Sequence, residues 1–192
     1  MSEAMEFVDI VILPKLKSTK EYFEETLKQL EGKFTKDEPF AESFSTMMKK
    51  SFLITTYSIL EKELSMLTRF VDAQDKSLIK LEDLKYRGIY RDYIYLTKVV
   101  QFKLPPDDIW KKIQTYNKIR NYFIHDPRVV LNRKEMKKIS NSLVPYIKFK
   151  REDAKKDRYI IEEIDSYIII DFLNTVEDFL RFLWSELESQ GY

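Results

Sequence analysis

The sequence predicts an all-α fold, an antiparallel helical bundle with one small β-hairpin before its last helix. Apolar residues recur at helical spacing over most of the 192 residues. Only three glycines and six prolines occur, too few for a turn-dense β-sandwich. A short alternating apolar pattern appears only between residues 146 and 161, where it is typical of a hairpin.

The first two helices are expected at residues 6–31 and 43–71. Pro14 should break or kink the first helix, and Gly32 should end it. The second helix has apolar residues over close to half its circumference, which indicates contact with more than one neighbour. Its start should be capped by a serine, either Ser43 or Ser45.

A third helix, rich in tyrosine, is expected at residues 78–102, and a fourth at 107–125. The tyrosines of the third could belong to the core or could stack on bases. Two prolines and two aspartates at 105–108 are a strong start signal for the fourth helix, and Asp126-Pro127 should end it.

The remainder of the chain is predicted to hold a short helix, the hairpin and the last helix. The short helix covers residues 132–142, and the strands cover 146–150 and 159–161 around a charged turn at 151–158. The last helix should run from about 165 to 188.

Composition excludes several kinds of site. The chain has no cysteine and one histidine, His125. Disulfide scaffolds, zinc-thiolate sites, cysteine nucleophiles and sites built on clustered histidines are therefore ruled out within one chain. Three glycines leave no room for a glycine-rich phosphate loop. We expect no metal and no cofactor.

Charge and hydropathy predict a cytoplasmic protein with no membrane partner. No run of about 18 apolar residues occurs, and the acidic start lacks the basic region of a signal peptide. The net charge is only +1, so nucleic-acid affinity would have to come from a local patch. No linker or internal repeat stands out, so residues 1–192 are expected to form a single domain.

The charges are unevenly distributed near the C-terminal end. Residues 128–158 hold eleven basic and four acidic side chains, a net of +7, whereas residues 159–192 hold eight acidic side chains and one arginine. The two segments could balance each other. Alternatively, the basic segment could bind RNA phosphates through the side chains Lys148, Lys150, Arg151, Lys155 and Lys156.

The residues that suggest chemistry lie at the end of the fourth helix. Asn121 and His125 are four residues apart and share a face, and the long side chain of Arg120 can reach it. The helix dipole favours a protonated histidine at this end. His125 could equally cap the helix or pair with Asp126.

The pattern of Arg120, Asn121, three residues and His125 resembles the motif of the HEPN superfamily of helical domains. The segment 51–61 is similar to the second helix of several HEPN branches, in which a glutamate faces the Arg/His site. The matching position is Glu61, whereas helical periodicity alone favours Glu63 as the carboxylate in the apolar sector. The resemblance covers residues 43–187, which leaves the helix at 6–31 as an elaboration.

This resemblance implies a metal-independent endoribonuclease of a toxin–antitoxin, abortive-infection or other antiviral system. It implies a homodimer in which both Arg/His motifs line one cleft, an RNA substrate, and an antitoxin or defence-system protein as a further partner. His125 would act as general acid or base, Arg120 would stabilise phosphate charge, and Asn121 would hold the histidine or a phosphate oxygen. Glu61 would face them.

One HEPN branch carries a tyrosine two residues after the histidine, at which an antitoxin modifies it. Position 127 is a proline here, so that form of control is not expected. Two alternatives remain open: a non-catalytic HEPN-like module for dimerisation or partner docking, and an unrelated helical bundle with a chance match. The sequence does not indicate which RNA would be cleaved.

Overall fold

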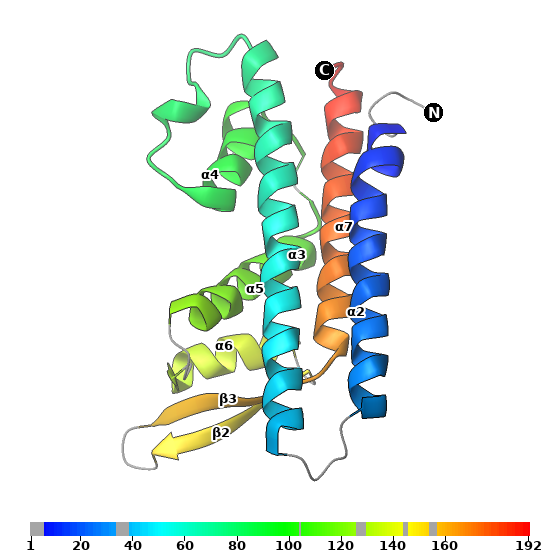
Figure 1. Cartoon of the computed structure of the whole chain (residues 1–192). Coiled ribbons are helices and arrows are strands. Elements are labelled where there is room, and N and C mark those ends of the chain that lie inside the picture. Colours follow the sequence, from blue (N-terminus) through cyan, green and yellow to red (C-terminus); the bar gives the residue numbers. More distant parts are fainter. Residues whose placement is uncertain (1–5, 34–38, 104, 126–129, 144–145, 154–156) are drawn as a thin grey trace.

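Three long helices lie side by side through the length of the molecule, as the computed structural model shows (Figure 1). They are α2 (Leu13–Lys33), α3 (Pro39–Gln74) and α7 (Tyr167–Ser189), with α2 antiparallel to the other two. The structure describes residues 6–33, 39–103, 105–125, 130–143, 146–153 and 157–192. The side chains of residues 30–33, 39–43, 125, 140, 142–143 and 153 are outside this description.

Shorter helices pack against the α3 and α7 side of this layer (Figure 1). They are α4 (Gly88–Ile94), α5 (Asp107–His125) and α6 (Arg133–Leu143). Irregular helical turns accompany them: η1 (Val8–Ile12) and η3 (Tyr95–Val99) are π-helical, and η2 (Leu81–Asp83) is a 3₁₀ turn.

A small antiparallel sheet lies below α6 in Figure 1. Its strands are β1 (Val130–Asn132), β2 (Ile147–Asp153) and β3 (Arg158–Ile164), in the order β1-β3-β2. Ile160 of the central strand β3 pairs with Val130 of β1 on one side and with Lys150 of β2 on the other. The predicted fold class is therefore confirmed as mainly helical with a small sheet, and β1 is a strand that the sequence pattern did not predict.

The predicted helices at 6–31, 107–125, 132–142 and 165–188 agree closely with the structure. Pro14 does not break the helix predicted at 6–31. The π turn Val8–Ile12 lies immediately before α2, and Leu13 N donates to Val8 O five residues back. This wider turn gives the chain a helical path into the proline-containing α2. Ser43 and Ser45 were wrong as caps, because α3 begins earlier, at Pro39, a residue suited to a first helical turn.

The continuous helix predicted at 78–102 is wrong. Residues after Gln74 form a loop with the short turn η2, and a helix resumes only at Gly88. Gly88 has φ +58°, a left-handed conformation that interrupts a right-handed helix and suits glycine. Of the predicted tyrosine stripe, Tyr95 is buried and Tyr93 stacks on Trp110 with ring centroids 3.7 Å apart, whereas Tyr86 and Tyr90 are exposed.

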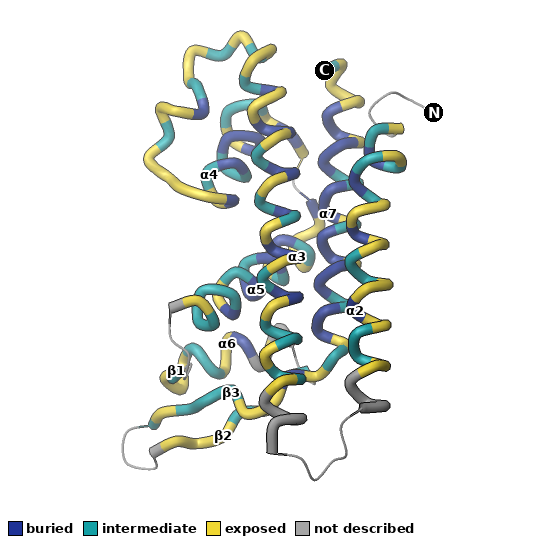
Figure 2. Tube along the Cα trace, viewed as in Figure 1, coloured by how far each residue is buried: buried dark blue, intermediate teal, exposed yellow. Residues whose placement is uncertain are grey.

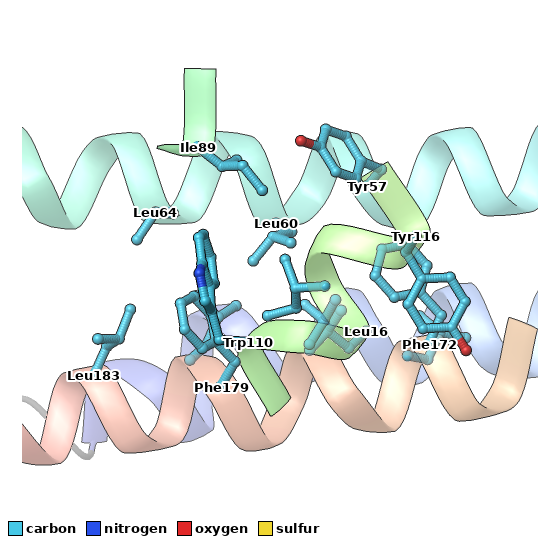
Figure 3. Packing of buried hydrophobic residues seen from close by; sticks show 14 of the residues in the cluster. Leu16, Tyr57, Leu60, Leu64, Ile89, Trp110, Tyr116, Phe172, Phe179 and Leu183 are labelled. Carbon is cyan, nitrogen blue, oxygen red and sulfur yellow. The ribbon is translucent and has the colours of Figure 1, made fainter. Parts of the chain in front are cut away.

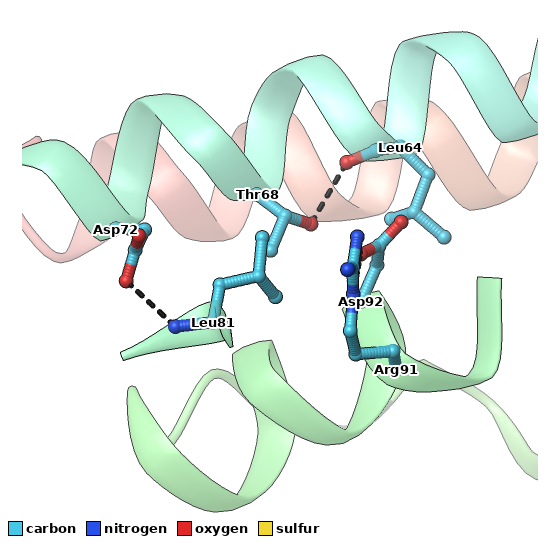
Figure 4. Close-up of polar contacts among 6 residues, drawn as sticks. All are labelled: Leu64, Thr68, Asp72, Leu81, Arg91 and Asp92. Atoms are coloured by element: carbon cyan, nitrogen blue, oxygen red, sulfur yellow. Dashed lines mark hydrogen bonds and ion pairs between the residues drawn. The ribbon is translucent and has the colours of Figure 1, made fainter. Parts of the chain in front are cut away.

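The loop after α3 is held to it by polar contacts (Figure 4). Leu81 N donates to Asp72 Oδ1 at 3.0 Å, and Arg91 pairs with Asp92 at 3.2 Å. Burial raises the pKa of Asp92 above its usual value, although the neighbouring Arg91 lowers it. The Leu81–Asp72 bond ties the loop to α3, whereas the Arg91–Asp92 pair lies within α4.

Buried side chains of η1, α2, α3, α4, α5 and α7 form one continuous cluster (Figures 2 and 3). Helix α5 reaches this cluster through Trp110, Ile113, Tyr116 and Ile119, all buried. The Tyr116 ring stacks on Phe172 of α7 with centroids 4.0 Å apart, as Figure 3 shows. Since aromatic side chains bury large apolar areas, this stack fixes the position of α5 against α7.

A polar contact reinforces the same junction. The Tyr116 hydroxyl donates to Asp171 Oδ2 at 2.7 Å, and Lys112 Nζ lies 2.9 Å from Asp171 Oδ1. Burial, followed by the hydrogen bond to Asp171, raises the pKa of Tyr116 far above its usual value. The hydroxyl therefore remains protonated and continues to donate.

Tyr116→Phe should lower the free energy of unfolding by about 1–3 kcal/mol, because a hydrogen bond to a charged carboxylate is lost. The matched control is Tyr167→Phe, which removes a hydroxyl from a side chain 68% exposed and should change stability by less than about 0.5 kcal/mol. Urea unfolding followed by circular dichroism measures both. Equal losses in the two variants would contradict the role given to Tyr116.

Candidate functional site

Arg120 lies where α5 crosses the lower part of α3. It continues the stripe of α5 that faces the core, since it is four residues after Tyr116. Its guanidinium carbon lies 5.0 Å from the centroid of the buried Tyr57 ring on α3. Arg120 Nη1 donates to Asn121 Oδ1 at 2.9 Å. The structure thus brings Arg120 and Asn121 together, as the motif predicted, and adds an aromatic ring beneath the guanidinium.

The positive charge of Arg120 is not neutralised by a contact within the described chain. No carboxylate of the described residues lies within 4.0 Å of its nitrogens. Its Nε is buried and has no hydrogen-bond partner. A half-buried cation without an anion costs folding free energy. Arg120 Nη2 makes no hydrogen bond among those described, so it can donate to an incoming anion such as phosphate.

Glu61 lies one helical turn above Tyr57 on the same side of α3. Burial raises the pKa of Tyr57, the charge of Glu61 raises it further, and Arg120 opposes both effects. Glu61, on α3, and Arg120, on α5, therefore have opposite effects on the pKa of Tyr57. The Glu61 carboxylate is nevertheless directed toward α4, with Oε1 3.4 Å from the position that a Cβ on Gly88 would take. It makes no ion pair with Arg120 among the contacts described.

Glu63 occupies the other side of α3. It is 1% exposed, and its Oε1 lies 2.7 Å from Lys15 Nζ on α2. The side chain that periodicity favoured thus binds α2, whereas the side chain that the HEPN resemblance indicated lies on the side of α3 that α5 contacts.

His125 is the last residue of α5, one turn after Asn121. Its side chain and the following residues 126–129, which include Asp126 and Pro127, are outside the described part of the chain. The backbone places His125 at the negative end of the helix dipole, which stabilises an imidazolium. The role of its side chain remains a prediction.

Lys50 is a second cation at this junction, and the sequence analysis missed it. Its Nζ lies 5.1 Å from the centroid of the Phe123 ring, two residues before His125. Among the described residues it has no carboxylate within 4.0 Å. Lys50 is seven residues before Tyr57, so helical spacing puts both on one side of α3. This seven-residue spacing is the sequence signal that could have placed Lys50 beside Tyr57.

Three of the five cations predicted to bind RNA on the hairpin are described, and each of these has an acidic neighbour. Lys148 lies 2.6 Å from Glu163, Lys150 lies 3.6 Å from Glu162, and Arg151 lies 3.4 Å from Asp157. Lys155 and Lys156 are outside the described residues. Within the described chain, the ion pairs of the basic segment are thus made inside the hairpin and not with α7. The acidic side chains of α7 pair with Lys103, Lys112 and Arg181.

A surface groove of about 550 Å³ lies elsewhere, between α2 and α3 on the side of α3 away from Tyr57. The described residues of its lining are apolar or carry hydroxyls: Ser18, Thr19, Tyr22, Met48, Ser51, Phe52 and Thr55. The groove therefore contributes nothing to the charged junction at Arg120.

No family model, curated protein or solved structure matches this chain. Within the described residues, no helix has the length and apolar character to cross a membrane, and no three acidic or histidine side chains gather as metal ligands would. The interpretation of the site therefore depends on its residues alone.

Arg120→Met should leave the free energy of unfolding unchanged or raise it by up to about 1 kcal/mol, because an unpaired cation is removed from a half-buried position. The matched control is Arg181→Met. Arg181 lies 3.1 Å from both Asp9 and Glu177, so its loss should cost about 0.5–1 kcal/mol. Thermal and urea unfolding measure both. A loss above about 2 kcal/mol for Arg120→Met would indicate a structural role instead.

Proposed function

We propose that this chain is a metal-independent endoribonuclease of the HEPN type that acts as a toxin or antiviral-defence effector. One observation carries the proposal: Arg120 is fixed by Asn121 and Tyr57 yet has no carboxylate partner among the described residues, near the end of the helix that terminates in His125. A phosphodiester is the anion that this arrangement and the resemblance of the motif jointly favour.

The chemistry needs only groups that the chain and RNA supply. The ribose 2′-oxygen attacks the adjacent phosphorus while the bond from phosphorus to the 5′-oxygen breaks. One histidine accepts the 2′-hydroxyl proton, and a second proton donor protonates the leaving 5′-oxygen. Arg120 stabilises the negative charge that grows on the non-bridging oxygens. The products are a 2′,3′-cyclic phosphate and a 5′-hydroxyl.

Each chain has a single histidine, so acid and base from histidines require two chains. A symmetric homodimer that places two α5 ends in one cleft meets this requirement, because a two-fold axis brings identical surfaces together. An antitoxin or defence-system protein would control such an enzyme by covering the cleft.

His125→Ala and Arg120→Ala should each lower the rate of RNA cleavage by roughly 10²-fold or more, since a general acid/base alone contributes about 10²–10⁴-fold. Cleavage of total RNA by the purified protein is measured with excess chelator present, followed by end-group analysis of the fragments. Lys118→Ala, an exposed change on the same helix, is the matched control and should retain activity.

Two results would contradict the proposal. Activity of His125→Ala close to that of the unmodified protein would leave His125 as a helix cap, worth about 1 kcal/mol of stability. A folded dimer without RNA cleavage would favour the alternative, a non-catalytic dimerisation or partner-docking module.

A mixed dimer of one unmodified and one His125→Ala chain tests the shared cleft. If the two chains provide acid and base to one site, its activity should fall well below half that of the unmodified dimer. Differently tagged chains allow the mixed species to be purified before assay. Activity at one half would mean two independent sites and would refute the composite cleft while leaving the ribonuclease proposal intact.

A further inference from the structure

The basic segment divides into two parts with different net charge. The strands β2 and β3 together carry four basic and four acidic residues, so the hairpin strands are neutral. Helix α6 carries four basic residues and one acidic residue. The excess positive charge of the described part of this segment therefore resides on α6.

Three of the four cations of α6 lie exposed to solvent on one face of the helix. Arg133, Lys134 and Lys137 are exposed and lie within an arc of about 100° on the helix. None has a carboxylate of the described residues within 4.0 Å, unlike the cations of β2. Their positive potential is therefore not locally cancelled, which favours attraction of a polyanion.

The one acidic residue of α6 has another role. Glu135 Oε2 accepts from Asn132 N, and Asn132 Oδ1 accepts from Glu135 N, both at 3.0 Å, which caps the start of the helix. Glu135 also accepts from Tyr122 of α5; burial and this bond raise the pKa of Tyr122 to about 12. Glu135 thus joins α6 to α5 two residues from Arg120.

The opposite face of α6 is already covered. Ile139 is 1% exposed and Met136 is packed against the core. A basic amphipathic helix that binds membranes inserts its apolar face, and that face is not free here. Figure 1 shows α6 beside α5 and above the hairpin. Helix α6 packs on α5, so its exposed cations lie on the helix next to the one that carries Arg120.

We propose that the exposed face of α6, formed by Arg133, Lys134 and Lys137, binds the sugar-phosphate backbone of RNA beside the Arg120 site. This inference rests on the proposed ribonuclease function, and it assigns RNA binding to α6 in preference to the hairpin. The contacts are sequence-independent, because lysine and arginine at the surface recognise phosphate charge.

The experiment compares two triple variants of the full chain. R133Q/K134Q/K137Q removes three of the four cations of α6, and K148Q/K150Q/R151Q removes the three cations of β2, so each variant loses three charges. Kd is measured for 2′-O-methyl RNA, which lacks the attacking hydroxyl, over a range of salt concentrations. Circular dichroism and thermal unfolding check that both variants fold; glutamine retains helix propensity.

The α6 variant should bind about tenfold or more weakly at low salt, and its plot of log K against log salt should be shallower by about 2, since each phosphate contact to a single strand contributes about 0.7. The hairpin variant should lose less than about threefold. R133K/K134R/K137R should bind like the unmodified protein, because the charges are kept.

Equal or greater loss in the hairpin variant would overturn the inference, as would unchanged affinity in the α6 variant. Binding to phosphatidylserine vesicles without binding to RNA would also overturn it. The result is separable from the proposed function. Salt-dependent binding through α6 without any cleavage would support this surface and refute the ribonuclease, whereas cleavage with unchanged binding of the α6 variant would do the reverse.

Discussion

The packing of α5 between α3 and α7 is the constraint on which the site depends. Tyr116 stacks on Phe172 and donates to Asp171, so the rotation of α5 about its axis is fixed from the α7 side. One turn later, the same stripe of the helix presents Arg120 to α3. An arginine in a stripe that is otherwise apolar must either find an anion or remain unpaired. Among the described residues it lies on Tyr57 and bonds a neutral amide, with no carboxylate within 4.0 Å.

Charged side chains at the α3–α5 junction differ from those elsewhere in the partners that they contact. Three buried or half-buried carboxylates elsewhere are paired: Glu63 with Lys15, Asp171 with Lys112, and Asp92 with Arg91. At the α3–α5 junction, two cations instead lie over aromatic rings: Arg120 lies over Tyr57, and Lys50 lies over Phe123. Cation–π contacts hold such groups in place without neutralising them. Neither of these two cations has a carboxylate of the described residues within 4.0 Å, in a chain whose net charge is only +1.

Sequence patterns predicted those elements whose signals are local. Helix α5 matches its predicted bounds because the prolines and aspartates at 105–108 mark its start and its apolar stripe is regular. The helix predicted at 78–102 failed because the tyrosine spacing imitates a helix, whereas Gly88 at positive φ and distant contacts, such as Tyr93 on Trp110, determine the real path. Strand β1 has three residues and exists through its pairing with β3, which no local pattern reveals.

The sequence allowed the residues of the candidate site to be predicted, but not the side chains that surround them. The spacing of Arg120, Asn121 and His125 indicated a common helix end, and the bond between Arg120 and Asn121 agrees with it. The partners of Glu63 and Arg120 come from residues 48 and 63 positions away, which periodicity does not encode. For the same reason, the hairpin cations could not be separated from those of α6 until the pairing of β2 with β3 was known.

That Arg120, which has no carboxylate partner among the described residues, receives a phosphate can be measured at its guanidinium, because the signal of the buried Nε shifts when an anion binds the neighbouring Nη2. The ¹H–¹⁵N signal of Arg120 Nε is assigned by its loss in Arg120→Lys and followed during titration with 2′-O-methyl RNA. Arg181 Nε, which already donates to Glu177 at 3.1 Å, is the internal reference. The account predicts a saturable shift of the Arg120 signal with little change at Arg181. An Arg120 signal that does not move at saturating RNA would contradict it.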